Sequence, residues 1–322
     1  MTENDILSEI ERKIKKSFRS KAGESFITLP WGNDCFCFKT ETNNSICITQ
    51  DSCIEHTHFE RNWLPPSLIS QKALRSAISD IAAVGGTPLF MLVSLGTPDT
   101  SKKFIREILR GIFAVSRKFN IELAGGNISY SKLLFIDTFI LGKAKKPMSR
   151  EGAMPGDSVF VSGTLGDSAV CVELLRNKNN KRLKNYFLKK FSLFEPRLKL
   201  GKEIFEIATA CTDLSDGLYK GLLNLSQRSN VSFYLETDKI PLSKQYKEVK
   251  KDNLIPAIFG GEDYELLFTS SKVKEVESIA KKQKIKIKNI GKVIKKEKSK
   301  IIFSDSSFIP SASPFEHFSK KR

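Results

Sequence analysis

The sequence lacks any long apolar run, and it has few of the residues that usually mark metal or disulfide proteins. Its 322 residues include three histidines, two tryptophans and six cysteines. A membrane-spanning helix needs about 20 consecutive apolar residues, and no stretch approaches that length. The first five residues are polar and acidic, and no apolar segment follows them. We therefore expect no membrane span, no secretory signal and a cytoplasmic protein.

The cysteines and histidines form no recognisable metal motif. No two cysteines make a C-x-x-C pair, and Cys35 and Cys37 flank Phe36 in an alternating apolar run. This alternation predicts buried, reduced thiols on one face of a strand, and it disfavours a zinc site or a disulfide framework. His56 and His58 are two potential ligands only, so we favour a surface or substrate-contacting role for them over metal chelation.

The usual phosphate-binding motifs are also missing. The chain contains no G-x-x-x-x-G-K-[ST], no G-x-G-x-x-G and no kinase H-R-D or D-F-G set. If the protein handles nucleotides, it does so outside the P-loop, Rossmann and protein-kinase schemes.

Negative charge is scarce, since 36 Asp and Glu stand against 53 Lys and Arg for a net charge of +17. Such an excess invites a nucleic-acid interpretation. However, 40 of the basic residues are lysines, whereas arginine is favoured for bidentate phosphate and base recognition. Twelve lysines lie within residues 272–300, and those at 284–288 alternate with isoleucine as on a half-solvated strand. We favour a lysine-rich, solvated surface in this segment over a nucleic-acid-binding stripe.

The spacing of apolar residues predicts the elements of the first half of the chain. Ser67 is the candidate N-cap of one helix, Thr100 or Ser101 caps the next, and Gly125-Gly126 is expected to form a turn between two strands. Helices are expected at 3–19, 67–84 and 100–119, and strands at 34–38, 45–49, 90–95, 121–124 and 133–142.

The segment from Pro147 to Gly156 is rich in proline and glycine, and it suggests a boundary between a domain of residues 1–146 and one of residues 147–322. The second half is expected to mix strands and helices without a strict repeat, which favours an α+β fold of two domains over one doubly wound sheet. Strands are expected at 159–162, 231–236, 264–269 and 284–290, and helices from 167 and at 198–211, 216–229 and 272–283, with a helix or loop at 176–190.

Acidic residues gather beside glycines or at the ends of predicted elements in five segments: 32–34, 49–51, 79–80, 213–217 and 260–263. Asp and Asn suit turns and N-caps, which explains any one segment alone. Several together are typical of a Mg²⁺ site, because hard cations take oxygen ligands from separate chain segments. Asp80 is expected late in its helix, where it needs a cation or hydrogen bonds. If the next helix starts at Ser215 or Asp216, Asp213 precedes it and Asp216 lies in its first turn.

Eight motifs in this order resemble those of the thiamine-monophosphate kinase family, in the superfamily of aminoimidazole ribonucleotide synthetase. The resemblance covers nearly the whole chain. The motifs are Gly32-Asn33-Asp34, Thr49-Gln50-Asp51 with Glu55 to Phe59, Ser79 to Pro88, Gly125-Gly126-Asn127, Arg150 to Asp157, Asp213 to Leu218, Gly260 to Leu266, and Phe315 to Phe318.

The resemblance implies Mg²⁺-dependent phosphoryl transfer from ATP to thiamine monophosphate. It also implies a fold in which N-terminal mixed sheets pair across a homodimer, a C-terminal α/β sandwich-like domain, and a nucleotide between the two domains, with no membrane or nucleic acid. The implied metal ligands are Asp34, Thr49, Asp51, Asp80, Asn127, Asp213 and Asp216; the implied ATP contacts are Gly126, Asn127, Arg150 and Ser215; the implied thiamine-phosphate contacts are His58, Glu262 and Phe315.

The acceptor in that reaction is a phosphate monoester with a second pKa of about 6, so it is already an anion near neutral pH. It needs no general base, and the sequence offers no obvious one. We therefore expect direct in-line transfer without a phosphoenzyme.

Three positions depart from the family pattern. Asn33 replaces the first Asp of G-D-D, Asn127 stands where many members have Asp, and His56 stands where many have Gly. Two other functions stay open: another ATP-using enzyme of the superfamily, such as a purine-pathway ligase, and a basic nucleic-acid-binding protein that uses residues 272–300. A selenophosphate-type synthetase is disfavoured, because no reactive cysteine lies in an N-terminal glycine-rich loop.

Overall fold

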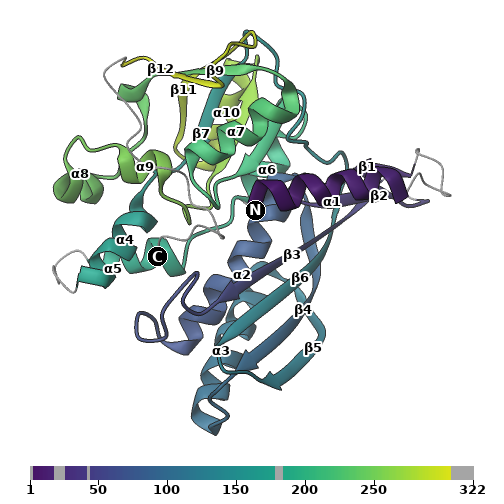
Figure 1. The fold of residues 1–322 in the computed structure, drawn as a ribbon, viewed down its shortest axis with the longest axis vertical. Helices are drawn as coiled ribbons and strands as arrows, with labels where there is room; N and C mark the ends of the chain where they lie inside the picture. Colours follow the sequence, from purple (N-terminus) through teal and green to yellow (C-terminus); the bar gives the residue numbers. More distant parts are fainter. Residues whose placement is uncertain (1–2, 18–25, 42–43, 178–183, 306–322) are drawn as a thin grey trace.

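The computed structural model describes residues 3–17, 26–41, 44–177 and 184–305, and these form two six-stranded sheets in different halves of the molecule (Figure 1). The first sheet has the order β1-β2-β3-β6-β4-β5. Its neighbouring strands are antiparallel except β4 and β5, which are parallel. The strands are β1 (Ile27–Leu29), β2 (Phe36–Lys39), β3 (Ser45–Ile54), β4 (Thr87–Thr97), β5 (Glu122–Tyr130) and β6 (Phe135–Ala144).

The helices of the first half are α1 (Glu3–Ser17), α2 (Pro66–Ala83) and α3 (Lys102–Phe119). Helix α2 packs on β3 and β6 and also contacts the second half of the chain, so it lies between the two sheets (Figure 1). Small and apolar residues cover most of its circumference, and a helix of that kind is normally buried. Helix α3 approaches α2 closely at Gly111, where an added Cβ would lie 2.0 Å from the Ser70 Oγ.

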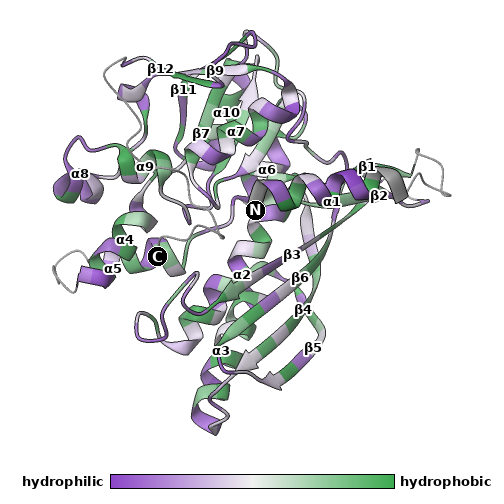
Figure 2. Cartoon of the chain, viewed as in Figure 1, coloured by the Kyte–Doolittle hydropathy of each residue, from purple (hydrophilic) through white to green (hydrophobic). Residues whose placement is uncertain are grey.

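The face of the first sheet opposite α2, called here the outer face, carries an apolar row. One row runs across four strands and joins Phe36, Ile48, Leu141 and Phe90 as successive partners. Figure 2 shows apolar residues along β4 and β6. Phe90 is 43% exposed, so the described residues leave part of this apolar row in contact with solvent.

The second sheet has the order β12-β9-β11-β7-β10-β8, and its strands are antiparallel except β12 and β9. Two mostly antiparallel mixed sheets with helices confirm the predicted α+β class. The strands are β7 (Ser158–Ser162), β8 (Ala210–Asp213), β9 (Ser232–Leu235), β10 (Leu266–Ser270), β11 (Ile287–Ile294) and β12 (Ile301–Phe303). The helices are α4 (Asp167–Asn177), α5 (Lys184–Ser192), α6 (Leu198–Ile204), α7 (Leu218–Ser229), α8 (Lys244–Lys250), α9 (Ile255–Phe259) and α10 (Val273–Gln283), with a 3-10 turn at Thr237–Lys239.

Two predicted caps had different outcomes. Ser101 caps α3, because its Oγ accepts a hydrogen bond from the Phe104 amide at 3.3 Å. Ser67 does not cap α2, because the helix already begins at Pro66 and no side chain caps it. Proline at the first helical position needs no partner for an amide, so the helix can start one residue earlier than predicted.

Three other local predictions were wrong. Gly125-Gly126 forms no turn, since β5 continues through both residues. The helix expected at 198–211 ends at Ile204, and its last two residues, Ala210 and Cys211, begin β8 instead. Helix α7 begins at Leu218, after Gly217 with a φ of 91°, so both Asp213 and Asp216 precede it.

The predicted burial of the cysteines and the predicted exposure of the lysines are confirmed. All six cysteines are buried and free. The lysines of residues 284–288 are exposed, and the isoleucines between them are half-buried. Among the described residues, no helix is long and apolar enough to span a membrane. The division into domains at residues 146 and 147 falls between β6 and β7, and it stays a prediction.

Candidate active site between the two sheets

Three carboxylates from distant segments meet where the two halves of the chain touch. Asp34 precedes β2, Asp80 lies in the last turn of α2, and Asp213 ends β8. One oxygen of each lies within 4.8 Å of the others. The side chain of Asp34 is 2% exposed and Asp213 is 4% exposed. We call these three residues the acid cluster.

Each member of the acid cluster has a donor. The Thr49 hydroxyl donates to Asp80 at 2.5 Å, and the Ser79 hydroxyl donates to Asp213 at 2.7 Å. The Arg150 guanidinium pairs with Asp34, with Nη2 and Oδ1 2.7 Å apart. Three carboxylates and one guanidinium leave two units of negative charge when all are ionised.

The uncompensated charge perturbs both remaining acids. Burial, followed by the charge of Asp34, raises the pKa of Asp213 to about 8. Burial, followed by Asp213 and Asp34, also raises the pKa of Asp80 well above its usual range. Oxygen ligands from separate segments with an unmatched charge of two suit a hard divalent cation, so the residues present fit Mg²⁺.

Asn33 has a structural role beside the acid cluster. Its Oδ1 accepts hydrogen bonds from the Arg150 amide at 3.0 Å and the Ser149 hydroxyl at 3.1 Å. Its Nδ2 donates to the Pro30 carbonyl at 3.2 Å. The amide therefore ties the segment before β2 to the segment that carries Arg150. An aspartate would lose the donor, which explains in physical terms why asparagine suits this position.

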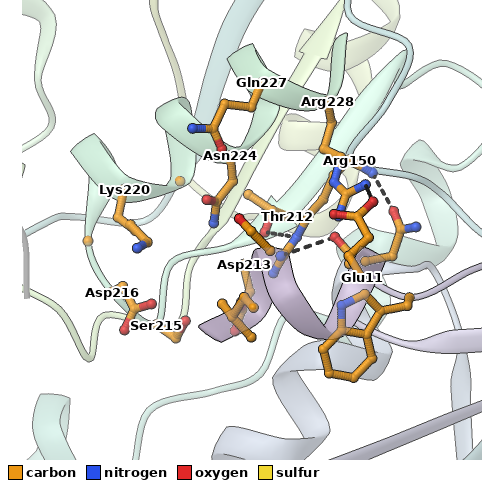
Figure 3. Close-up of a pocket in the computed structure, with 17 residues that line it drawn as sticks. Glu11, Arg150, Thr212, Asp213, Ser215, Asp216, Lys220, Asn224, Gln227 and Arg228 are labelled. Atoms are coloured by element: carbon orange, nitrogen blue, oxygen red, sulfur yellow. Dashed lines mark hydrogen bonds and ion pairs between the residues drawn. The ribbon is translucent and has the colours of Figure 1, made fainter. Parts of the chain in front are cut away.

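The first cavity, called here the polar cavity, has a volume of about 400 Å³ and lies beside the start of α7. Figure 3 shows Lys220 and Asn224 on α7, with Ser215 and Asp216 in the loop before the helix. Arg150 also lines the cavity and connects it to the acid cluster. The cavity is also lined by Leu7, Ser8, Glu11, Trp31, Gly32, Asn33, Thr212, Asp213, Gly217, Gly221, Gln227 and Arg228.

The second cavity, called here the aromatic cavity, has a volume of about 710 Å³. Its aromatic side chains are Trp63, Phe191, Phe259 and Tyr264, and its ionisable ones include Asp51, His58, Lys72 and Glu262. Ser215 and Asp216 line both cavities. The loop before α7 is therefore the place where the two cavities meet, next to the acid cluster.

The structure places most predicted site residues in this region. Asp51 faces the aromatic cavity, and its pKa is raised chiefly by burial. His58 lines the same cavity, and its Nδ1 lies 3.0 Å from the Ile54 amide. His56 has a φ of 67°, a left-handed conformation that favours glycine, and its Nδ1 lies 2.8 Å from Glu60.

Gly126 and Asn127 lie elsewhere, on the exposed strand β5, and line neither cavity. In the register of the sheet, Asp51 on β3 lies opposite Thr138 on β6. Thr138 lies opposite Val93 on β4, and Val93 lies opposite Gly126 on β5. Three strand spacings, about 14 Å, therefore separate Asp51 from Gly126 within one chain. Phe315 lies outside the described residues. The roles of all the predicted site residues stay predictions.

Several residues of the site were not found from the sequence, and Lys72 is the most consequential. Lys72 projects from α2, is 1% exposed and forms an ion pair with Glu262. One signal was available: a charged residue within a helix made mostly of small and apolar residues has to find a buried partner. Ser76, Ser79 and Thr212 also support the acids, but serine and threonine are too common to stand out.

Two protein families match this chain. The family described as AIR synthase related protein, N-terminal domain, matches residues 32–144, and the corresponding C-terminal domain family matches residues 154–304.

Two relatives are thiamine-monophosphate kinases. The one from Aquifex aeolicus is 35% identical over 71% of this chain and 77% of its own length. The one from Buchnera aphidicola subsp. Acyrthosiphon pisum is 31% identical over 98% of this chain and 99% of its own.

A solved structure described as AaThiL complexed with AMPPCP and TMP is 30% identical to this chain, with a TM-score of 0.84. The similarity covers 98% of this chain and 97% of that one. With its two-sheet fold, its acid cluster and these full-length relatives, the chain belongs to the thiamine-monophosphate kinase family.

Proposed function

We propose that this protein transfers the terminal phosphoryl group of ATP to the phosphate of thiamine monophosphate, giving ADP and thiamine diphosphate. The observation that carries the proposal is the acid cluster beside the junction of two cavities of different chemistry. A relative that holds AMPPCP and TMP supports this choice over a purine-pathway ligase of the same superfamily.

The two cavities suit the two substrates. The polar cavity carries Arg150 and Lys220 and begins at the N-terminal end of α7, which favours phosphate groups. The aromatic cavity offers ring faces together with carboxylates, which suits a cationic heteroaromatic ring. In this arrangement the two phosphates would meet near Ser215 and Asp216, the residues that both cavities share.

The main task of the residues is then to bring two polyanions together. Mg²⁺, when bound, would neutralise and orient the phosphate oxygens. Asp34, Asp80 and Asp213 would hold it, with Thr49 orienting Asp80 and Ser79 orienting Asp213. Asp51, Asp216 and Asn127 are further proposed ligands.

No residue has to remove a proton, because the acceptor phosphate is already an anion near neutral pH. We therefore propose direct in-line transfer. A stable phosphohistidine or phosphoaspartate trapped on the working enzyme would contradict it.

The proposed assembly is a homodimer that buries the outer face of the first sheet. An apolar row across four strands, with Phe90 43% exposed, is a surface that a second copy would cover. We also propose the domain division at residues 146 and 147 and a cytoplasmic location.

The test is a coupled assay of ADP formation with a panel of phosphate acceptors. We expect Mg²⁺-dependent ADP formation with thiamine monophosphate and none with purine precursors. ADP formation with another acceptor alone would overturn the proposal. Salt-sensitive binding to RNA or DNA, lost when the lysines of residues 272–300 are replaced, would instead favour the nucleic-acid alternative.

A further inference from the structure

A buried lysine lies at the wall of the aromatic cavity. The Lys72 ammonium pairs with the Oε2 of Glu262 and lies 4.6 Å from the centre of the Phe191 ring and 5.5 Å from that of Tyr264. Its side chain is 1% exposed, whereas that of Glu262 is 20% exposed. Both residues line the cavity, and the carboxylate presents far more of its surface there than the lysine does.

Stability alone does not explain this arrangement. Replacing a buried ion pair with apolar residues of similar volume is often neutral or stabilising. A helix as apolar as α2 could pack a leucine or methionine against Phe191 and Tyr264 at this position. The lysine instead gives Glu262 a buried partner of opposite charge.

The loop that carries Glu262 is constrained as well. Glu262 has a φ of 71° and Tyr264 a φ of 48°, left-handed values that cost energy for residues other than glycine. The Glu262 amide donates to the Ser215 carbonyl at 2.6 Å, and the Tyr264 amide donates to the Leu214 carbonyl at 3.0 Å. Backbone bonds thus hold the loop to the segment between the cavities, and Lys72 holds its carboxylate.

We propose that Lys72 is a positioning residue for substrate specificity: it fixes the Glu262 carboxylate so that its free side selects a cationic heteroaromatic ring in the aromatic cavity. This inference rests on the proposed function, in which the thiazolium ring of thiamine monophosphate is that cation. Phosphate monoesters without a positive ring would gain nothing from the carboxylate. Lys72 also lines the cavity, but its side chain is 1% exposed against 20% for Glu262, so in this scheme the carboxylate and not the ammonium meets the substrate.

A double-mutant cycle tests the proposal through Lys72→Met, Glu262→Gln and the double variant. The readouts are the KM values for thiamine monophosphate and ATP, kcat, and the Kd for thiamine monophosphate by calorimetry without ATP. We expect Lys72→Met to raise the KM and Kd for thiamine monophosphate at least tenfold and to leave the KM for ATP within twofold. The double variant should be no weaker than Glu262→Gln alone, because Lys72 acts through Glu262.

Lys118→Met is the matched control. Lys118 also pairs with a glutamate, Glu195, and lies 5.2 Å from the ring centre of Phe119, but it does not line the aromatic cavity. This variant should keep wild-type constants. If Lys72→Met does not fold, Lys72→Gln replaces it in the cycle, because glutamine keeps an N–H donor for Glu262 while removing the charge.

The outcomes separate the two proposals. A wild-type protein that forms no ADP with thiamine monophosphate overturns the proposed function. If the wild type is active and the Lys72 variant has an unchanged KM for thiamine monophosphate, the Lys72 inference alone is overturned. Independent effects of Lys72→Met and Glu262→Gln, which multiply in the double variant, would also overturn it, because Lys72 would then act without Glu262.

Discussion

Replacing Asp80 by asparagine should make the metal-free protein more stable and the enzyme far less active. The acid cluster holds two buried carboxylates and the half-buried Asp80 against one guanidinium. Asparagine removes one negative charge and keeps a carbonyl oxygen for the Thr49 hydroxyl, which donates to Asp80 at 2.5 Å. The change therefore relieves repulsion at little cost in hydrogen bonding.

The expected magnitude follows from the geometry. With the oxygens at the 4.8 Å limit and an effective dielectric of about 20, two carboxylates repel each other by about 3 kcal/mol. Arg150 compensates Asp34, so the main gain comes from the Asp80–Asp213 pair. We expect Asp80→Asn to raise the free energy of unfolding by about 3 kcal/mol in EDTA at pH 8. In excess Mg²⁺ the wild type should gain more from binding than the variant, and turnover of the variant should fall about 100-fold or more.

The stabilisation should depend on pH. The pKa of Asp213 is raised from 3.8 to about 8 in the folded protein, so the folded state holds a proton that the unfolded state releases. Stability of the metal-free wild type therefore falls as pH rises from about 4 to about 8, and the advantage of the variant grows over the same range.

Urea unfolding in EDTA at several pH values, with matched samples in Mg²⁺, measures this effect. The control is Ser79→Ala at the neighbouring position, which removes a hydrogen bond to Asp213 without removing a charge. A variant less stable than wild type at pH 8 in EDTA, or a gain independent of pH, would refute the electrostatic reasoning.

Three further predictions concern residues around the site. Asn33→Asp should cost about 1–2 kcal/mol in urea unfolding, because the new carboxylate faces the Pro30 carbonyl that Asn33 now donates to at 3.2 Å; an unchanged midpoint would contradict this. Leu92→Asp, on the outer face where Leu92 is 43% exposed, should give folded monomers in sedimentation velocity, and a surviving dimer would count against the proposed interface. Replacing the three lysines of residues 284–288 by glutamine should leave the KM for ATP within twofold in a steady-state assay, since these lysines line neither cavity; a large increase would mean that they steer the nucleotide.

The sequence was a good guide to the acids and a poor guide to the backbone that presents them. Asp34, Asp80 and Asp213 were recognised because glycines and element ends flank them, and those features are local. Their mutual distance was not predictable, because it depends on how α2 packs between the two halves of the chain. Lys72 was missed for the same reason: its partner Glu262 lies 190 residues away.

The wrong local predictions have physical causes as well. Gly125-Gly126 resembles a turn, but an added Cβ at Gly126 would lie 1.9 Å from the Val93 carbonyl oxygen. The glycine therefore allows β4 and β5 to approach each other closely at this position. Residues 210 and 211 were predicted as the end of a helix, yet both are buried and belong to β8. A short apolar run reads alike in a buried strand and a buried helix.

Helix α2 fixes the distance between the aromatic cavity and the acid cluster. It carries Lys72 at the aromatic cavity and Asp80 in the acid cluster, eight residues further along the helix. At about 1.5 Å per residue these two positions are about 12 Å apart along a nearly rigid rod. In the proposed reaction, the ring is held near Lys72, by Glu262, and the phosphate is held near Asp80, in the acid cluster. The protein would thus select for the distance between ring and phosphate as well as for the chemistry of each end. An analogue with a longer or shorter link between them would fail to occupy one of the two positions.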